Sequence, residues 1–290
     1  MVVAATGFFD GVHKGHKKVL SLLCDIAAQE GKKSAVITFW PHPRNVLQQQ
    51  AYSLRLLTSI EEKKSLVKGL GVNKFITIPF CKEFSRNTTR EFLKDYLKDK
   101  YNVSTLIIGY DHRFGHDKVS HEEMMAMAQE IGIKIIKVSE FIQDENVISS
   151  TKIRNLLQEG NVERANDFLG YRYGLKGVVV SGQKVGRTIG FPTANLQVDS
   201  LKLIPSDGVY VVEVVVRGKE YRGVLNIGTR PTVSGDKRTI EVHIIGYEGV
   251  ELYGDELELR FLRFLRHEQR FSSLEDLREQ IRKDFNRANV

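Results

Sequence analysis

The pattern of apolar residues changes near Gly170, and this change limits the folds that the chain can adopt. Before Gly170, short apolar runs alternate with longer segments whose apolar residues recur at helical spacing, which is typical of parallel strands joined by helices. After it, short β-type runs follow one another, which predicts an antiparallel barrel. A length of 290 residues also favours two domains. We therefore expect an α/β domain with a parallel sheet over residues 1–170 and a β-barrel domain over residues 171–290.

The expected elements follow from these patterns. In the first domain the expected strands are 2–5, 34–39, 74–78, 104–108 and 133–138. The expected helices are 17–30, 58–70, 89–100, 122–130, one that begins after Ser149 or Ser150, and 161–169. In the second domain the expected strands are 175–180, 194–198, 209–216, 221–227, 239–247 and 256–261. A capping box at Ser273 and Asp276 predicts a C-terminal helix to about Arg287.

The stretch TGFFDGVHKGH, from Thr6 to His16, joins the first strand to the first helix. A glycine-rich turn of this kind directs backbone N–H groups and the positive end of a helix dipole at an anion. His13 and His16 are three residues apart, so both rings can face the same side and donate hydrogen bonds to phosphate oxygens. We interpret the stretch as a phosphate site. A metal site formed by Asp10 with both histidines, or a purely structural turn, are the alternatives.

Further polar residues follow the second and fourth strands, at the edge of the sheet where ligands bind. His42 stands between two prolines that interrupt the second strand, and it is either a ligand contact or a hydrogen-bonding residue of the loop. The fourth strand leads into a segment rich in His and Asp. Its residues match no zinc spacing, so a solvated loop is preferred to a metal site: Asp111, His112, His116, Asp117 and His121.

The segment ISSTKIR at residues 148–154 places a serine cap and two basic residues in the first turn of a helix. Phosphate could bind there, and an ordinary capped helix is the alternative. In the barrel, the basic segment 182–190 is not a Walker A loop, yet its N–H groups, its arginine and the Thr and Asn that follow could hold ATP and Mg²⁺. Glu241 lies on a strand, opposite in direction to Ile240 and Val242. An isolated strand glutamate is more commonly solvated than catalytic.

Composition excludes several classes of protein. The net charge of +7 suits polyanionic ligands, but the Lys and Arg residues are dispersed, which favours nucleotide phosphates over nucleic acid. No apolar run approaches the roughly 20 residues of a membrane span, and no signal peptide precedes the first strand. Cys24 and Cys81 are too few for a disulfide framework, so we expect the reducing cytoplasm. Nothing in the sequence indicates an oligomeric state.

Four segments, in order, resemble the bacterial bifunctional riboflavin kinase/FMN adenylyltransferase family, also called FAD synthetase. They are GFFDGVHKGH at 7–16, ISSTKIR at 148–154, GRTIGFPTAN at 186–195, and Glu241 in IEVHI. The resemblance covers nearly the whole chain. It implies a Rossmann-like nucleotidylyltransferase domain followed by a riboflavin kinase barrel. The barrel would convert riboflavin and ATP to FMN and ADP. The first domain would then convert FMN and a second ATP to FAD and pyrophosphate, with Mg²⁺ required and no nucleic acid or membrane partner.

The resemblance also assigns roles to single residues. In the first domain His13, His16 and Arg154 would be catalytic and Asp111 would contact the flavin. The residues that would bind ATP there are Gly7, Phe9, Asp10, Gly15, Ser149, Ser150 and Thr151.

In the barrel Glu241 would be the general base, Thr193 would ligate Mg²⁺ and Pro192 would contact the flavin. The residues that would bind ATP are Gly186, Arg187, Gly190 and Asn195. Trp40 and His112 depart from the family pattern on the adenylylation side. A riboflavin kinase whose adenylyltransferase domain is impaired is therefore the alternative function.

Overall fold

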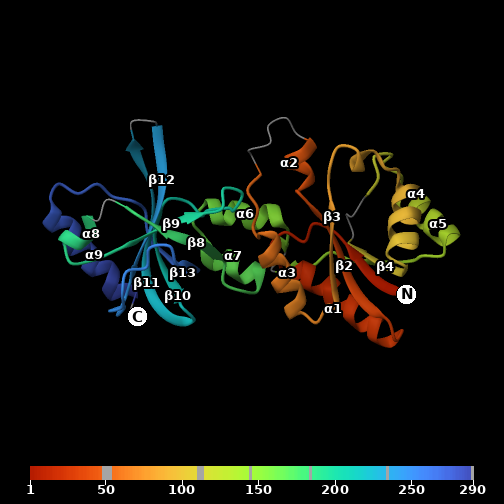
Figure 1. Cartoon of the computed structure of the whole chain (residues 1–290), viewed down its shortest axis with the longest axis horizontal. Coiled ribbons are helices and arrows are strands. Elements are labelled where there is room, and N and C mark those ends of the chain that lie inside the picture. Colours follow the sequence, from red (N-terminus) through yellow and green to blue (C-terminus); the bar gives the residue numbers. More distant parts are fainter. Residues whose placement is uncertain (48–53, 110–113, 144–145, 183–184, 233–234, 289–290) are drawn as a thin grey trace. The chain divides into compact units, whose positions relative to one another are not determined.

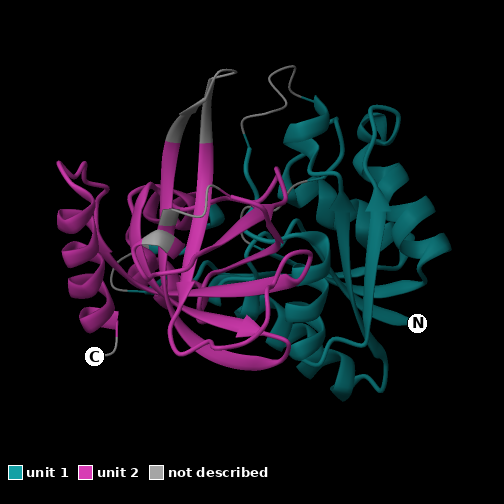
Figure 2. Ribbon diagram, turned by 60° about the vertical axis from the view of Figure 1, so that its left-hand side comes forward, with its two compact units in different colours: residues 1–150 teal, residues 151–290 magenta. Residues whose placement is uncertain are grey.

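The computed structural model describes residues 1–47, 54–109, 114–143, 146–182, 185–232 and 235–288 (Figure 1). The chain forms two compact units, unit 1 over Met1–Ser150 and unit 2 over Thr151–Val290, which Figure 2 shows in different colours. This division lies earlier in the chain than the boundary expected at residue 170. It groups α7 (Val162–Leu169) with the barrel, because Asn166 Nδ2 of α7 donates to the carbonyl oxygen of Phe261, 2.9 Å away on a barrel strand.

Unit 1 contains a five-stranded parallel sheet in the order β3-β2-β1-β4-β5, which confirms the predicted sheet. Its strands are β1 (Val2–Thr6), β2 (Lys33–Trp40), β3 (Lys74–Pro79), β4 (Val103–Gly109) and β5 (Lys134–Val138). The chain runs from β1 to β2 on one side and later crosses over to place β4 on the other side of β1. The carboxyl end of β1 is therefore the topological switch point, where open α/β sheets bind ligands.

Helices cover both faces of this sheet, because its strands are apolar on both sides. Val3 and Ala5 of β1 pack with α1 (Lys14–Gln29) and α3 (Ile60–Gly69). Val2 and Ala4 point to the opposite face, into a core that is covered by other helices. These are α4 (Thr89–Glu91), its π-helical continuation η2 (Phe92–Lys100) and α5 (His121–Ile131).

Some short elements of unit 1 were not expected. Pro43 begins the helix α2 (Pro43–Leu47), where we expected a loop; the error arises because proline, which ends strands, is also favoured at the first position of a helix. The others are the 3₁₀ turn η1 (Phe84–Arg86) and the hairpin of β6 (Ile142–Gln143) and β7 (Asn146–Val147).

Unit 2 contains a closed barrel in the order β10-β11-β12-β9-β8-β13, all neighbours antiparallel, as predicted. Its strands are β8 (Gly174–Val180), β9 (Ala194–Val198), β10 (Gly208–Val216), β11 (Lys219–Thr232), β12 (Gly235–Ile244) and β13 (Glu256–Arg266). Arg217 and Gly218 join β10 to β11 with φ angles of 48° and 80°. Two positive φ values in a two-residue turn match the right-handed twist of the flanking strands.

Three further helices of unit 2 accompany the barrel: α6 (Ser150–Gln158), which begins at the last residue of unit 1, the short α8 (Val185–Thr188) and the C-terminal α9 (Leu274–Ala288). Ser273 Oγ accepts a hydrogen bond of 3.1 Å from Asp276 N, so the predicted cap of α9 forms. Among the residues that the structure describes, no helix has the length and apolar character needed to cross a membrane.

Candidate active sites

The turn between β1 and α1 has a strained backbone. Phe9, Gly11 and Val12 have φ angles of 47°, 81° and 36°. Positive φ is unusual for Phe and more so for the β-branched Val, and such strain persists only where the surroundings hold it. Phe9 and Val12 are buried in the core between the sheet and α1, which supplies that restraint. The strained turn lies at the switch point of the sheet, where a functional site is expected.

His13 and His16 face the same side, as predicted. His13 caps α1, and its Nδ1 accepts a 3.3 Å hydrogen bond from His16 N. The two rings stack with centroids 3.6 Å apart at 18°. Burial, followed by the nearby His13 and Lys63, lowers the pKa of His16 well below its ordinary 6.5. His16 Nδ1 is buried and has no hydrogen-bond partner in the part of the chain that the structure describes. Both observations favour a neutral imidazole.

Two glycines of the motif make room for aromatic rings. A Cβ atom on Gly15 would lie 3.2 Å from both Cε1 and Nδ1 of His13, and one on Gly7 would lie 3.1 Å from the ring of Phe9. The Phe9 ring in turn meets the His16 ring edge-on, with centroids 5.2 Å apart. Substitution of either glycine would therefore displace a ring that positions the histidine pair.

The Asp10 side chain points into the protein. Its carboxylate accepts hydrogen bonds of 3.1 Å from Leu57 N and Thr58 N and one of 3.2 Å from Thr58 Oγ1. Thr58 Oγ1 also accepts from Gly11 N at 3.1 Å. Asp10 thus connects the turn to the beginning of α3, and its contact with ATP stays a prediction.

Lys63 of α3 is a residue that the sequence reasoning missed. It is 3% exposed, although lysine is almost never fully buried. Burial lowers the pKa of its ammonium, and the Asp10 carboxylate opposes this shift. The signal was present in the sequence, because Lys63 occupies a position of the apolar stripe of α3 together with Ile60 and Val67.

Only part of the segment ISSTKIR, residues 148–154, belongs to unit 1 with the two histidines. Ser150 Oγ donates a 2.8 Å hydrogen bond to the Asp10 carbonyl oxygen, so this serine reaches the turn within unit 1. Ser149 precedes it, whereas Thr151 and Arg154 lie on α6 and belong to unit 2. Asp111, the predicted flavin contact, lies outside the described residues. His42 Nδ1 accepts a 3.2 Å hydrogen bond from Arg44 N, so this side chain binds the backbone at the beginning of α2.

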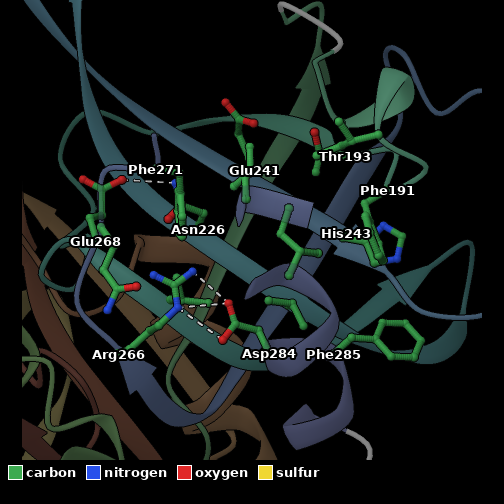
Figure 3. Close-up of a pocket in the computed structure, with 17 residues that line it drawn as sticks. Phe191, Thr193, Asn226, Glu241, His243, Arg266, Glu268, Phe271, Asp284 and Phe285 are labelled. Carbon is green, nitrogen blue, oxygen red and sulfur yellow. Dashed lines mark hydrogen bonds and ion pairs between the residues drawn. The ribbon is translucent and has the colours of Figure 1, made fainter. Parts of the chain in front are cut away.

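Unit 2 contains a cavity of about 240 Å³ between the barrel, the segment after β13 and α9 (Figure 3). Glu241 and Thr193, which are distant in sequence, both line it. Glu241 on β12 is in register with Asn226 on β11 and with Asn195 on β9. Residues opposite one another on neighbouring strands share a face, so these three form a polar row across the barrel. Asn226 was missed because strand register is not visible in the sequence.

The glycine-rich loop before β9 is tightly folded. A Cβ atom on Gly186 would lie 2.2 Å from the Phe191 carbonyl oxygen, and Phe191 N donates to Gly186 O at 2.8 Å. We expected a glycine-punctuated loop here; within it the structure forms the short helix α8, because this backbone closure winds the segment into one helical turn. Gly190 has a φ angle of 84°, and Arg187 forms an exposed ion pair of 2.7 Å with Glu251.

Asn195 and Pro192 are placed beside the cavity. A Cβ atom on Gly182 would lie 2.2 Å from Asn195 Nδ2, so this amide packs against the loop backbone. The Pro192 carbonyl oxygen is 2.8 Å from His243 Nδ1. His243 lies two residues after Glu241 on β12 and lines the same cavity, which the period of two in a strand could have indicated.

The opposite wall of the cavity holds a buried ion pair. Arg266 of β13 donates to Asp284 of α9, with Nη2 and Nε at 2.8 and 3.0 Å from Oδ2 (Figure 3). Gln280 Nε2 adds a 2.9 Å hydrogen bond to Asp284 Oδ1. Asp284 is 1% exposed, so this pair fixes α9 to the barrel. Among the described residues, no group of His, Cys, Asp and Glu side chains is arranged to hold a metal ion.

Comparisons with known proteins match each of the two parts of the chain to a family model. Residues 1–152 match the family model described as FAD synthetase, and residues 169–290 match the one described as riboflavin kinase. The bifunctional riboflavin kinase/FMN adenylyltransferase of Listeria monocytogenes is 38% identical over 283 residues, covering 97% of this chain and 90% of the relative. The protein with the same description from Bacillus subtilis is 36% identical over 287 residues, with the same two coverages.

A crystal structure of a Streptococcus pneumoniae protein, described as a macrolide-efflux protein, has a TM-score of 0.92 at 29% identity. The match covers 99% of this chain and 93% of that chain. The solved structure thus shares both units, and the two family models match the two parts of the chain separately. This chain belongs to the bifunctional riboflavin kinase/FMN adenylyltransferase family.

Proposed function

We propose that the two reactions of the family occur at the two sites described above. FMN is adenylylated at the turn between β1 and α1, and riboflavin is phosphorylated at the cavity of the barrel. The observation that carries the proposal is that Glu241 and Thr193 line one cavity, while the stacked histidines occupy a separate switch point. We retain residue 170 as the functional boundary, because ISSTKIR extends beyond unit 1 and Ser150 contacts Asp10.

In the kinase reaction, Glu241 accepts the proton of the riboflavin 5′-hydroxyl. That oxygen attacks the γ-phosphorus of ATP, the bond to the bridging oxygen breaks, and FMN and ADP result. Glu241 lies on the middle of three paired strands, which fixes the backbone that carries the proposed base. We assign Gly186, Arg187, Gly190 and Asn195 to ATP and Pro192 to the flavin.

The donor atoms at the cavity fit Mg²⁺. Thr193, Glu241 and Asn226 offer hydroxyl, carboxylate and amide oxygens on one cavity, and hard oxygen donors are those that Mg²⁺ prefers. Thr193 would hold the ion, which would neutralise charge on the β- and γ-phosphates when bound. Glu241 would remain the group that takes the proton.

In the adenylyl transfer, the FMN phosphate attacks the α-phosphorus of ATP and pyrophosphate leaves. The nucleophile is already anionic, so no general base and no covalent intermediate are needed. A neutral His16 whose Nδ1 is buried would carry its proton on Nε2 and donate a hydrogen bond from Nε2 to a phosphate oxygen, keeping the proton. His13, Arg154 and the N–H groups of the turn would share the developing charge, and Asp111 would contact the flavin. We propose the cytoplasm as the compartment, since Cys24 and Cys81 are both free.

The test is chromatography of the full chain incubated with riboflavin, ATP and Mg²⁺, with FMN and FAD followed over time. We expect FMN first and FAD after it. FMN without FAD would support the alternative of a kinase with an impaired first domain. Neither product from folded protein would contradict the proposal.

A further inference from the structure

The buried ammonium of Lys63 is not explained by the stability of the fold. Lys63 lies in the first turn of α3, where the positive end of the helix dipole disfavours a cation. The residue lies on the apolar stripe of α3 and is 3% exposed. Replacing a buried charge by a well-packed apolar side chain of similar volume is commonly neutral or stabilising. An apolar residue at this position would therefore suit α3 better, and the cation needs another reason.

The surroundings of Lys63 connect it to the histidine pair. Asp10 is the anion that acts on Lys63, and its carboxylate is held by Leu57 and Thr58 immediately before α3. The groups that act electrostatically on His16 are His13 of the same helix and Lys63 of α3. The ring of Phe9 covers another side of His16. Lys63 is thus buried on the helix whose start binds the Asp10 carboxylate, and it acts electrostatically on that carboxylate and on His16.

We propose that Lys63 is a positioning residue of the adenylyltransferase site, and that its buried ammonium acts through Asp10 and His16 to hold the turn ready for the phosphates of ATP. With Asp10, it fixes the strained turn against α3. Toward His16, it opposes a second proton on the imidazole, so that the ring keeps one N–H for phosphate and stacks on His13 without charge repulsion. The inference rests on the proposed role of His16.

The test uses the full chain with supplied FMN and Mg·ATP. We would measure kcat/KM for adenylylation as a function of pH for Lys63→Met, Lys63→Arg and the matched control Lys64→Met, whose side chain is exposed on the same helix. Riboflavin phosphorylation by each sample reports that the other unit is intact. Unfolding followed by the fluorescence of Trp40, the only tryptophan, reports on unit 1.

We expect Lys63→Met to lower kcat/KM on the order of 10²-fold, the effect of a small misplacement of reacting groups. We also expect the acidic limb of the plot of kcat/KM against pH to move to higher pH in this variant, because loss of the cation lets His16 take a proton more readily. Lys63→Arg keeps the charge and should keep the limb at its wild-type position. Lys64→Met should match the wild type in both respects.

Two results would overturn the proposal. One is a Lys63→Met enzyme that is less stable but has an unchanged acidic limb and kcat/KM. The other is a Lys63→Arg enzyme whose limb shifts as far as that of Lys63→Met, since the charge would then not be responsible. A parallel His16→Ala variant separates the two hypotheses: if it retains full adenylylation, the assignment of the site itself fails.

Discussion

The two sites of this protein are constructed in different ways. In unit 1, the site is formed by eleven consecutive residues, 6–16, around a strained turn, in which the side chains of His13 and Asp10 are buried. In unit 2, the site is a cavity lined by side chains from several strands and from α9, among them Glu241 and Arg266. The first site depends on the local path of the chain, whereas the second depends on strand register. Substitutions should therefore act on one site without disturbing the other.

The largest expected effect is on the site in the barrel. Glu241→Gln should lower the rate of FMN formation by about 10²–10⁴-fold, because the general base is removed. Adenylylation of supplied FMN should stay at the wild-type rate. Glu256→Gln, an exposed strand glutamate of the same barrel, is the control and should be silent. Wild-type phosphorylation by the Glu241 variant, followed by chromatography, would show that the base is elsewhere.

The reciprocal test concerns the turn. His16→Ala should lower FAD formation from supplied FMN by about 10²–10³-fold, the usual loss for one donor to a developing charge. FMN formation from riboflavin should be nearly unchanged. His116→Ala removes an exposed histidine of the same unit and serves as the control. Loss of both activities from a folded His16 variant would contradict the separation of the sites.

A smaller effect concerns stability. Asp284→Ala leaves Arg266 buried without its carboxylate partner and should lower the free energy of unfolding of unit 2 by about 3–5 kcal/mol. Lys283→Ala on the same helix breaks only an exposed ion pair with Glu279, and should cost at most about 0.5 kcal/mol. Urea unfolding followed by circular dichroism measures both. Equal effects of the two substitutions would mean that the buried pair does not hold α9.

The smallest effect is a pH dependence of unit 1. Unfolded His16 binds a proton as the pH falls below 6.5, whereas the folded residue does so only at lower pH. The stability is therefore complete above 6.5 and declines below it, with His16 contributing up to about 1.4 kcal/mol per pH unit. Urea unfolding followed by Trp40 fluorescence would measure the slope. His16→Ala should reduce it, and an identical slope would show that His16 is not buried as a neutral ring.

Much of the fold could be predicted because the spacing of apolar residues differs between helices and strands. β1 and β2 are continuous apolar runs, and Ser59 caps α3 with the capping box that its sequence indicates. Short elements were less visible. The helix α8 forms because Gly186 lets the backbone close on Phe191, and no periodicity records such a closure.

The order of strands and helices, the common direction of His13 and His16 and the position of Glu241 on a strand follow from the sequence alone, because each depends on residues a few positions apart. Which distant groups meet depends on the tertiary structure. It brought Asp10 to Thr58, Glu241 to the cavity of Thr193, and Asp284 to Arg266. It also set how completely the Lys63 side chain of α3 is buried, although its place on the apolar stripe is visible in the sequence. Strand register and contacts between distant segments are set by the packing of the whole unit, which no local pattern encodes.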